Sequence, residues 1–216
     1  MTVALTLSAQ SPIISFMHYA ALVMSVLALL FTVTSFWWLH ARPGRLRAYE
    51  PTKWSAYLRL DRSALRLPLV LHNTGPASLV VISLRVRFSE SGELMPWEWT
   101  RTRVDPQADD VQDVTAPFSI PGRDTRELVA EFVGSYPGVV PEQRAYPVAV
   151  EARSSVSDDW HEVLKFDLQL GNLIHPSNYI VYTNQHDYLS EREVEEGAQN
   201  LAKLRKQWGL DVGVDN

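Results

Sequence analysis

Six histidines, an acidic loop and one glycine–serine turn have the chemistry for catalysis or metal binding. The histidines form no His-x-His or His-Glu-x-x-His spacing, which would direct two rings at one metal ion. They are His18, His40, His72, His161, His175 and His186. The sequence Gly134-Ser-Tyr-Pro-Gly138 is a turn, with its serine in the wrong position for a nucleophile elbow. No glycine-rich phosphate-binding motif occurs in the sequence, so we expect no nucleotide site.

The acidic loop contains carboxylates that a hard cation such as calcium accepts as ligands. They are Asp105, Asp109, Asp110 and Asp113. Their spacing differs from that of an EF-hand loop, and the alternative is a loop whose charges are simply solvated. The chain has no cysteine, which excludes disulfide bonds, thiolate catalysis and cysteine metal sites. We therefore expect a protein without a metal, a cofactor or enzymatic activity.

Charge is segregated along the chain. All 20 basic and all 25 acidic residues lie from Arg42 onward. Residues 42–66 contain seven basic and two acidic residues, a net charge of +5, and residues 67–216 carry a net charge of −10. A basic collar beside an acidic body fits attraction to anionic lipid headgroups, whereas a nucleic-acid-binding domain needs a basic face. We expect a lipid bilayer as a partner and no nucleic acid.

Residues 13–39 form a run of 27 residues without a formal charge. A helix of this length spans roughly 40 Å, more than the hydrocarbon core of about 30 Å. Pro12 suits the first helical turn, and Trp37 and Trp38 at the other end favour the membrane interface. A cleavable signal peptide is the alternative, but residues 35–40 are bulky where a peptidase needs small side chains. We predict a transmembrane helix over 13–39.

The flanks of this helix predict its orientation. Basic residues follow it within about 15 positions, and the N-terminal side offers only the α-amino group. The positive-inside bias places the C-terminal domain in the cytoplasm and the N-terminus outside the cell membrane. The residues that we assign to the membrane surface are Trp37, Trp38, Arg42, Arg45 and Arg47.

One face of the helix carries small and weakly polar residues at alternating spacings of three and four. Small residues let two helices approach closely in lipid, where no hydrophobic effect drives association. We consider this stripe as a seam for a homodimer or for a partner membrane helix. The alternative is chance, because Ala, Ser and Thr are common in membrane spans. The seam residues are Ala21, Ser25, Ala28 and Thr32, continued by His18 and Ser35.

Beyond the collar, the pattern changes to the alternation of apolar and polar residues that is typical of β-strands. Seven runs show it: 54–60, 65–71, 80–88, 114–120, 128–132, 146–152 and 164–170. A short eighth strand passes through Trp97 and Trp99. In the run 80–88 we expect Val80, Ile82 and Leu84 on the buried face. Strands with one apolar face bury it by packing two antiparallel sheets, so we predict a sandwich of seven or eight strands over 54–171.

Three features of this domain resemble the immunoglobulin-like sandwiches of bacterial envelope and membrane-anchored proteins. They are the Asn73-Thr74-Gly75 hairpin between two strands, the Phe118–Gly122 approach to the fifth strand, and Tyr146 at the head of the sixth. The resemblance covers residues 54–170 and lacks the cysteine pair of antibody domains. It implies the architecture alone. Domains of this kind usually bind or space other molecules.

The tail begins with a short strand over 178–183 and continues into a helix over about 190–208. Ser190-Glu-Arg-Glu193 forms a capping box that opens the helix, and Gly209 ends it. Val194, Leu201 and Trp208 lie on one side of this amphipathic helix. They either anchor a partner protein or pack the helix on the sandwich, and the sequence leaves both open.

These patterns divide the chain into five segments: 1–12, a transmembrane helix at 13–39, a basic linker at 40–53, the sandwich at 54–171 and an extension at 172–216. We expect a single-pass membrane-tethered protein-interaction or scaffold module with an unidentified protein partner. The alternative is an extracytoplasmic ligand-binding or adhesion-type module in the opposite orientation. An enzyme would require groups that converge from distant positions.

Overall fold

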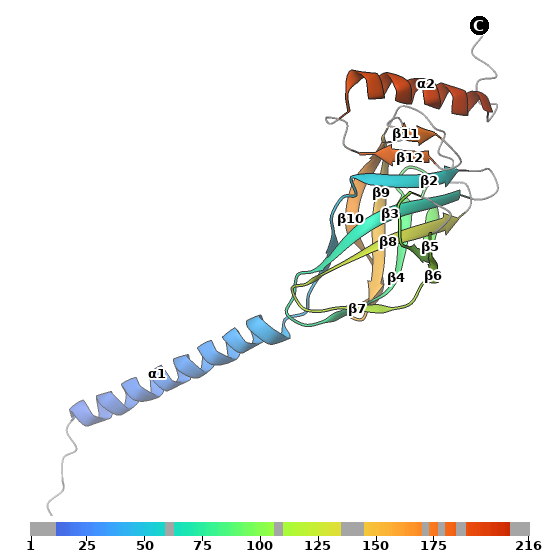
Figure 1. Cartoon of the computed structure of the whole chain (residues 1–216). Helices are drawn as coiled ribbons and strands as arrows, with labels where there is room; N and C mark the ends of the chain where they lie inside the picture. Colours follow the sequence, from blue (N-terminus) through green and yellow to red (C-terminus); the bar gives the residue numbers. More distant parts are fainter. Residues whose placement is uncertain are drawn as a thin grey trace, which may run out of the picture. The chain divides into compact units, whose positions relative to one another are not determined.

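A computed structural model describes residues 12–58, 63–105, 110–134, 145–169, 173–176, 180–184 and 189–207. The chain divides into two units, Met1–Arg42 and Pro43–Asn216, each with its own internal contacts. The first unit contains helix α1 (Pro12–Phe36) and a turn of π-helix, η1 (Trp37–Ala41). The second contains a sheet and helix α2 (Glu191–Gln207), as Figure 1 shows.

Helix α1 has the length and composition of a membrane span. The stretch Phe16–Ala41 has a mean hydropathy of 2.0, and none of the side chains in its most apolar part is buried. Leu, Val, Met and Phe side chains therefore lie open on all faces of the helix, as they do in a helix surrounded by lipid. The prediction of one apolar N-terminal helix is confirmed, with observed bounds of Pro12–Ala41 in place of 13–39.

The second unit is mainly β, as predicted, and its strands pair antiparallel throughout the described residues. Twelve strands occur there, more than the seven or eight that the alternation predicts. They are β1 (Leu46–Ala48), β2 (Lys53–Leu58), β3 (Ser63–Asn73), β4 (Leu79–Phe88), β5 (Leu94–Arg101), β6 (Gln112–Val114), β7 (Phe118–Ile120), β8 (Thr125–Gly134), β9 (Ala145–Ser154), β10 (Ser157–Gln169), β11 (Leu173–Pro176) and β12 (Ile180–Thr183).

The strands form one continuous, barrel-like sheet (Figure 1). Nine of them follow one another in the order β10-β9-β4-β5-β8-β3-β2-β12-β11, while β1 pairs with β3, β6 with β5 and β7 with β4. Strand β5 connects its two halves. Its first residues pair with β4, and from Trp97 onward it pairs with β8. A bulge between Trp97 and Trp99 separates these pairings, and the Trp97 indole N–H donates to the Trp99 carbonyl at 2.9 Å. Bulges bend a strand, so β5 can turn the corner between the halves.

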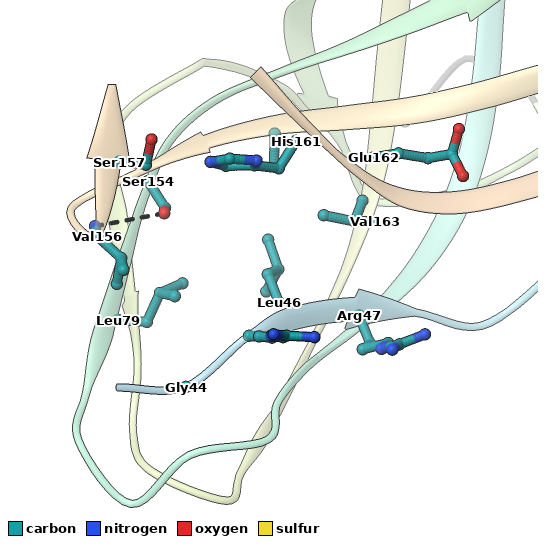
Figure 2. A pocket seen from close by; sticks show the side chains of 12 residues that line it. Gly44, Leu46, Arg47, Leu79, Ser154, Val156, Ser157, His161, Glu162 and Val163 are labelled. Atoms are coloured by element: carbon teal, nitrogen blue, oxygen red, sulfur yellow. Dashed lines mark hydrogen bonds between the residues drawn. The ribbon is translucent and has the colours of Figure 1, made fainter. Parts of the chain in front are cut away.

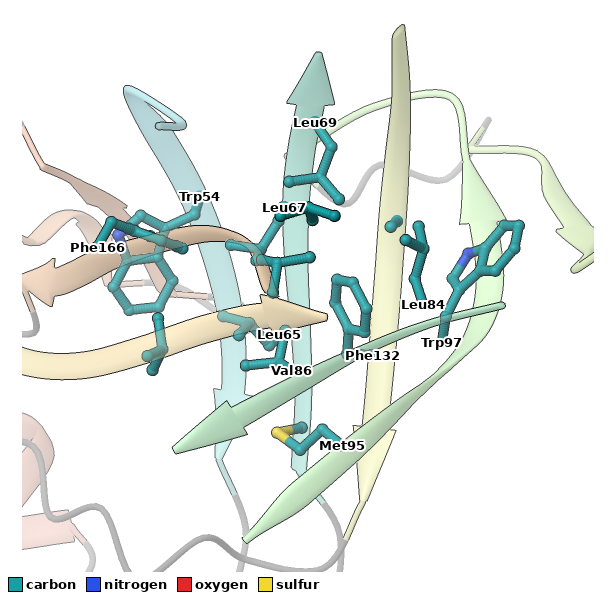
Figure 3. Close-up of a cluster of buried hydrophobic side chains, with 14 of the residues drawn as sticks. Trp54, Leu65, Leu67, Leu69, Leu84, Val86, Met95, Trp97, Phe132 and Phe166 are labelled. Carbon is teal, nitrogen blue, oxygen red and sulfur yellow. The ribbon is translucent and has the colours of Figure 1, made fainter. Parts of the chain in front are cut away.

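The core lies inside this curved sheet. Phe132 on β8, Leu84 on β4 and Leu67 on β3 are fully buried and face one another across the interior (Figure 3). The alternating leucines of β3 point inward from Leu65 to Leu71, as their period of two predicts. Each fully buried side chain of this size contributes roughly 1.5–3 kcal/mol by leaving water.

The predicted face of β4 is wrong in its first half. Leu79 and Val81 are buried, whereas Val80 and Ile82 are only partly buried. A register shift against β9 between Val81 and Ser83 changes the alternation, so that Leu84 is again buried as predicted. One extra residue in a bulge moves the preceding side chains to the other face, which an unbroken alternation cannot anticipate.

The run 114–120 is not one strand. It divides into β6 and β7, which pair with β5 and β4 respectively, and the side chain of Val114 is 75% exposed. Short strands also occur outside the predicted sandwich. The linker residues Leu46–Ala48, for which no strand is predicted, pair with β3, whereas β12 lies within the predicted tail strand over 178–183 and pairs with β2. Three-residue strands carry too little alternation for a sequence pattern to reveal them.

The Asn73 side chain connects the loop that follows β3 with the loop that follows β7. This buried side chain donates to the carbonyls of Ala77 at 2.8 Å and Pro121 at 3.1 Å, and accepts the N–H of Gly75 at 3.0 Å. Gly44 passes so close that an added Cβ would collide with the Asn73 side chain and the Gly75 backbone. Glycine at position 44 therefore permits this close approach.

We expect Asn73→Ala to lower the free energy of unfolding by about 2–4 kcal/mol, because buried carbonyls and an N–H lose their partners. Urea titration of the full chain in detergent, followed by tryptophan fluorescence, measures the change. Asn200→Ala is the matched control, since Asn200 is partly exposed on α2 and its side chain has no hydrogen bond in the described part of the chain. Equal stability of the two variants would contradict the role of Asn73.

Candidate functional site

A pocket lies between strands β1 and β10, with a volume of about 490 Å³. The two strands lie beside each other, and in the described residues β1 pairs with β3 alone and β10 with β9 alone. The pocket therefore occupies a gap between two strand edges of the barrel-like sheet. Its lining also includes residues from β4, β9 and the turn between β9 and β10 (Figure 2).

The inner part of the pocket is apolar. Leu46 and Val163 point into it from β1 and β10, and Leu79 lies near Gly44 (Figure 2). Leu46 is partly buried against the core, whereas Arg45 and Arg47, its neighbours in the chain, are exposed and also line the pocket. Because successive strand residues face opposite sides, the arginines point away from the apolar interior that Leu46 enters and lie at the exposed edge of the pocket, its rim.

Polar groups line the opposite wall. The Ser154 hydroxyl accepts the Val156 N–H at 3.4 Å, and the Ser157 hydroxyl accepts the Asp159 N–H at 3.1 Å. His161 and Glu162 follow on β10. Sequence reasoning identified Arg45 and Arg47 only as membrane-surface residues, and it missed the serines. Nothing in the pattern brings residues 44–47 next to residues 154–163, which are more than 100 positions away.

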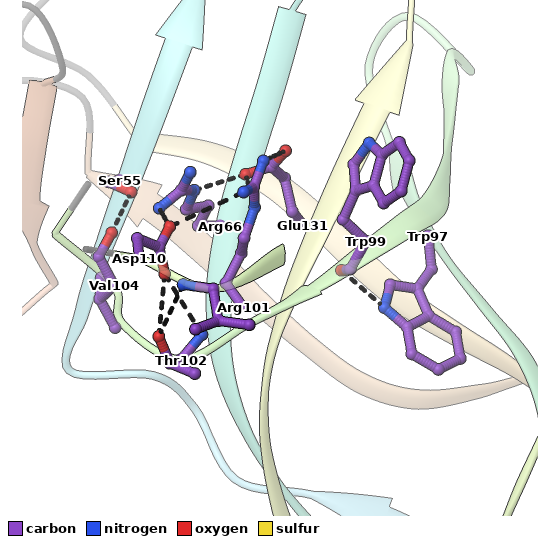
Figure 4. A network of polar contacts seen from close by, with 10 residues as sticks. Ser55, Arg66, Trp97, Trp99, Arg101, Thr102, Val104, Asp110 and Glu131 are labelled. Carbon is purple, nitrogen blue, oxygen red and sulfur yellow. Dashed lines mark hydrogen bonds and ion pairs between the residues drawn. The ribbon is translucent and has the colours of Figure 1, made fainter. Parts of the chain in front are cut away.

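A second polar cluster lies on β3, β5 and β8. Arg66 and Arg101 both donate to the Glu131 carboxylate, Arg101 through two bonds of 2.9 Å (Figure 4). Arg66 also pairs with Asp110 at 2.7 Å. The side chains of Arg66, Asp110 and Glu131 are each less than a tenth exposed. Paired, hydrogen-bonded charges of this kind can be buried without a large loss of stability.

This cluster fastens the acidic loop to the sheet. The Asp110 carboxylate accepts from Thr102 at 3.1 Å, and the Ser55 hydroxyl donates to the Val104 carbonyl at 2.7 Å. Asp110 thus neutralises arginines, while Asp113 lies exposed in β6 and Asp109 falls outside the described residues. Among the residues that the structure describes, no group of three His, Asp or Glu side chains could hold a metal ion.

A third cluster covers the outer face of β4, β9 and β10. Glu151 accepts from Arg85 at 2.6 Å and from Arg87 at 2.7 Å. The Arg85 guanidinium also lies over the Trp160 ring, 4.1 Å from its centroid, and Arg153 approaches the same ring at 5.9 Å. These contacts join three adjacent strands, so the cluster stabilises this half of the sheet.

The pKa of Glu151 reflects two opposing effects. Burial raises it, but the hydrogen bonds from Arg87 and Arg85 and their positive charges outweigh burial, so the pKa lies below its ordinary value of 4.5. A carboxylate with a lowered pKa in the folded state stabilises the fold above its unfolded pKa. That contribution is lost as the pH falls through the folded pKa.

Three of the five predicted membrane-surface residues, Trp37, Trp38 and Arg42, lie at the end of the apolar helix in the first unit. The Trp37 and Trp38 side chains are about half exposed, and the Arg42 guanidinium lies 4.3 Å from the centroid of the Trp38 ring. The Arg42 N–H closes the π-helical turn by donating to the Trp37 carbonyl at 2.9 Å. An aromatic pair with a cation over it combines groups that favour the membrane–water interface.

The four seam residues are exposed on α1. The Ser25 hydroxyl donates to the Ala21 carbonyl and the Thr32 hydroxyl to the Ala28 carbonyl, each at 2.8 Å. Both hydroxyl protons are therefore used inside the helix. A contact along this face would rely on the close approach of small side chains and not on hydrogen bonds donated by these hydroxyls.

The tail helix begins with the predicted capping box. The Ser190 N–H donates to the Glu193 carboxylate at 2.8 Å, and the Glu193 N–H donates back to the Ser190 hydroxyl. Leu201 is 5% exposed and belongs to the core cluster, so it packs the helix onto the domain. Val194 is 37% exposed and remains accessible for a partner. Trp208 lies outside the described residues.

No protein-family model matches the chain, and no curated protein matches it. Among solved structures, a similar chain is described as the crystal structure of a protein from Archaeoglobus fulgidus. It is 10% identical in sequence, with 67% of this chain and 98% of that chain covered and a TM-score of 0.31.

We expect Glu151→Gln to lower the free energy of unfolding by about 2 kcal/mol at neutral pH, because two charge-assisted hydrogen bonds are weakened. Below pH 4.5 the difference in unfolding free energy between the variant and the unchanged chain should shrink, because protonation of Glu151 removes the same charge. Urea titrations at successive pH values measure both effects. Glu127→Gln, at an exposed carboxylate without an ion pair among the described residues, is the control. A pH-independent difference would contradict the assignment.

Proposed function

We propose that this protein is a non-catalytic interaction or scaffold module, tethered to the cell membrane by helix α1. The observation that supports it most directly is the contrast between the two units. Every side chain of α1 from Phe16 to Thr34 is exposed, whereas the domain has a buried core of apolar side chains such as Leu67, Leu84 and Phe132. An apolar helix with exposed side chains on all faces requires an apolar environment, which a bilayer supplies.

The proposal places the domain in the cytoplasm and the N-terminus outside. Basic residues follow the span, beginning with Arg42, Arg45 and Arg47, whereas the residues before it in this sequence include no basic side chain. This difference supports the orientation through the positive-inside bias. The Arg42 guanidinium over Trp38 keeps one of these charges at the end of the helix.

For the domain we propose an immunoglobulin-like arrangement as the finer description of the fold. The strand order supports it: β10, β9 and β4 pair in sequence in one half of the sheet, and β8, β3 and β2 in the other. Tyr146, at the head of β9, is buried at the position where many such domains carry a conserved tyrosine. Domains of this architecture commonly present surfaces to partners, which accords with an interaction role.

The membrane tether and its orientation are tested with two fusions at the C-terminus of the full chain. We expect the chain to remain in the membrane fraction after alkaline carbonate extraction, with a fluorescent green fluorescent protein fusion and an inactive alkaline phosphatase fusion. Deletion of residues 13–39 should release the protein into the soluble fraction. Phosphatase activity would instead support the extracytoplasmic alternative, and a soluble full chain would contradict the tether.

The interaction role is tested by cross-linking in cells followed by affinity capture of the full chain. We expect a protein to be enriched over a control chain that retains residues 1–42 and lacks the domain. Val194→Lys tests contacts of the exposed tail-helix face, and the pair Ala21→Ile and Ser25→Ile tests the helix seam. Loss of at least about tenfold in capture, equivalent to 1.4 kcal/mol, assigns the contact to the altered face. Capture equal to that of the domain-free control would contradict an interaction through the domain.

A further inference from the structure

We propose that the pocket between β1 and β10 binds the headgroup of an anionic phospholipid, with the phosphate held at the rim by Arg45 and Arg47. This inference rests on the proposed membrane tether, because the ligand comes from the bilayer that the tether crosses. It adds a specific lipid site to a domain whose partners the proposed function leaves unidentified.

The position of the pocket in the chain brings it near the headgroups. Gly44 is the first residue of its lining, and only Arg42 and Pro43 separate it from Ala41, the last residue of η1. Even a fully extended chain places Gly44 at most about 11 Å from Ala41. The surface of a bilayer around the apolar helix is therefore within reach of the chain segment that contains both rim arginines.

Arg45 and Arg47 have the charge that such a headgroup requires. Both side chains are exposed, and no carboxylate of the described residues lies within ion-pair distance of either guanidinium. By contrast, Arg66, Arg85 and Arg101 are each neutralised by a carboxylate within 3 Å. The planar guanidinium matches two phosphate oxygens at once, so an arginine pair at a pocket rim suits a phosphodiester.

The far wall supplies hydrogen-bond donors. The hydroxyl oxygens of Ser154 and Ser157 accept backbone N–H groups, and neither hydroxyl donates its proton to an acceptor in the described part of the chain. His161 adds a ring N–H beside them. Glu162 is the one carboxylate in the lining, and it lies at the other end of the pocket from the serines, 3.9 Å from Arg87 (Figure 2). The serine end therefore offers hydrogen-bond donors and no carboxylate of the lining.

The apolar lining favours a lipid over free phosphate. Leu46, Leu79 and Val163 form a hydrophobic surface below the charged rim, and Val156 lies at the edge with half of its surface exposed. Glycerol and the first methylene groups of an acyl chain fit such a surface, and each buried methylene contributes to affinity. Inorganic phosphate has no group that would occupy it.

The test is a native mass spectrometry titration of the full chain in detergent with dioctanoyl phosphatidylglycerol and, separately, with dioctanoyl phosphatidylcholine. We expect one tightly bound phosphatidylglycerol and clearly weaker binding of phosphatidylcholine. Loss of both rim charges in Arg45→Gln with Arg47→Gln should weaken phosphatidylglycerol binding about 30-fold. A millimolar excess of inorganic phosphate should not displace the lipid.

Two variants separate a pocket from general attraction to a basic collar. Val156→Trp fills the pocket and keeps every charge, so it should abolish binding. Lys203→Gln with Lys206→Gln removes the same charge from exposed positions on α2 and should leave binding unchanged. Circular dichroism checks that each variant is folded.

Equal binding of the two lipids, displacement by phosphate, or unchanged binding in Val156→Trp would each overturn the lipid site. None of these outcomes bears on the tether, which is tested separately by membrane extraction. A full chain that binds phosphatidylglycerol in detergent but fails to remain with membranes would instead overturn the tether alone.

Discussion

The closure of the sheet depends on the backbone of β5. Its first residues bond to β4 and its later residues to β8, and the bulge between Trp97 and Trp99 lets one strand serve both halves. Without that change of partner, the halves would present two further open edges with unpaired N–H and C=O groups. The core residues of β3, β4 and β8 meet because β5 brings the two halves around a common interior.

Charged residues reinforce this arrangement from the outside. Glu131 connects β8 to arginines on β3 and β5, and Glu151 connects β9 to two arginines on β4. Each carboxylate thus bridges neighbouring strands on a solvent-facing side, where the acidic loop and Trp160 shield the pairs. Cross-strand ion pairs that are partly desolvated and hydrogen-bonded stabilise a sheet more than exposed pairs do.

In the described residues, the barrel-like sheet is open between β1 and β10. The pocket that we propose as a lipid site lies in this gap. The strand β1 follows the apolar helix directly, so the open edge belongs to the part of the domain closest in sequence to the membrane. Asn73 and Gly44 hold the loop after β3 close to the chain segment that precedes β1. The pocket and its two arginines, which have no ion pair among the described residues, therefore follow the span within a few residues of the chain.

The sequence by itself determined the apolar helix, the mainly β domain and the capped tail helix. These follow from local patterns: an uninterrupted apolar run, alternation with a period of two, and the Ser190–Glu193 box. Tertiary structure alone decided the rest. The bulge at Val81–Ser83 changed the buried face of β4, and pairing with β3 made a strand of Leu46–Ala48. The pocket and the Arg66–Asp110 pair join residues far apart in the chain, because hydrogen bonding between strands, and not neighbouring sequence, brings them together.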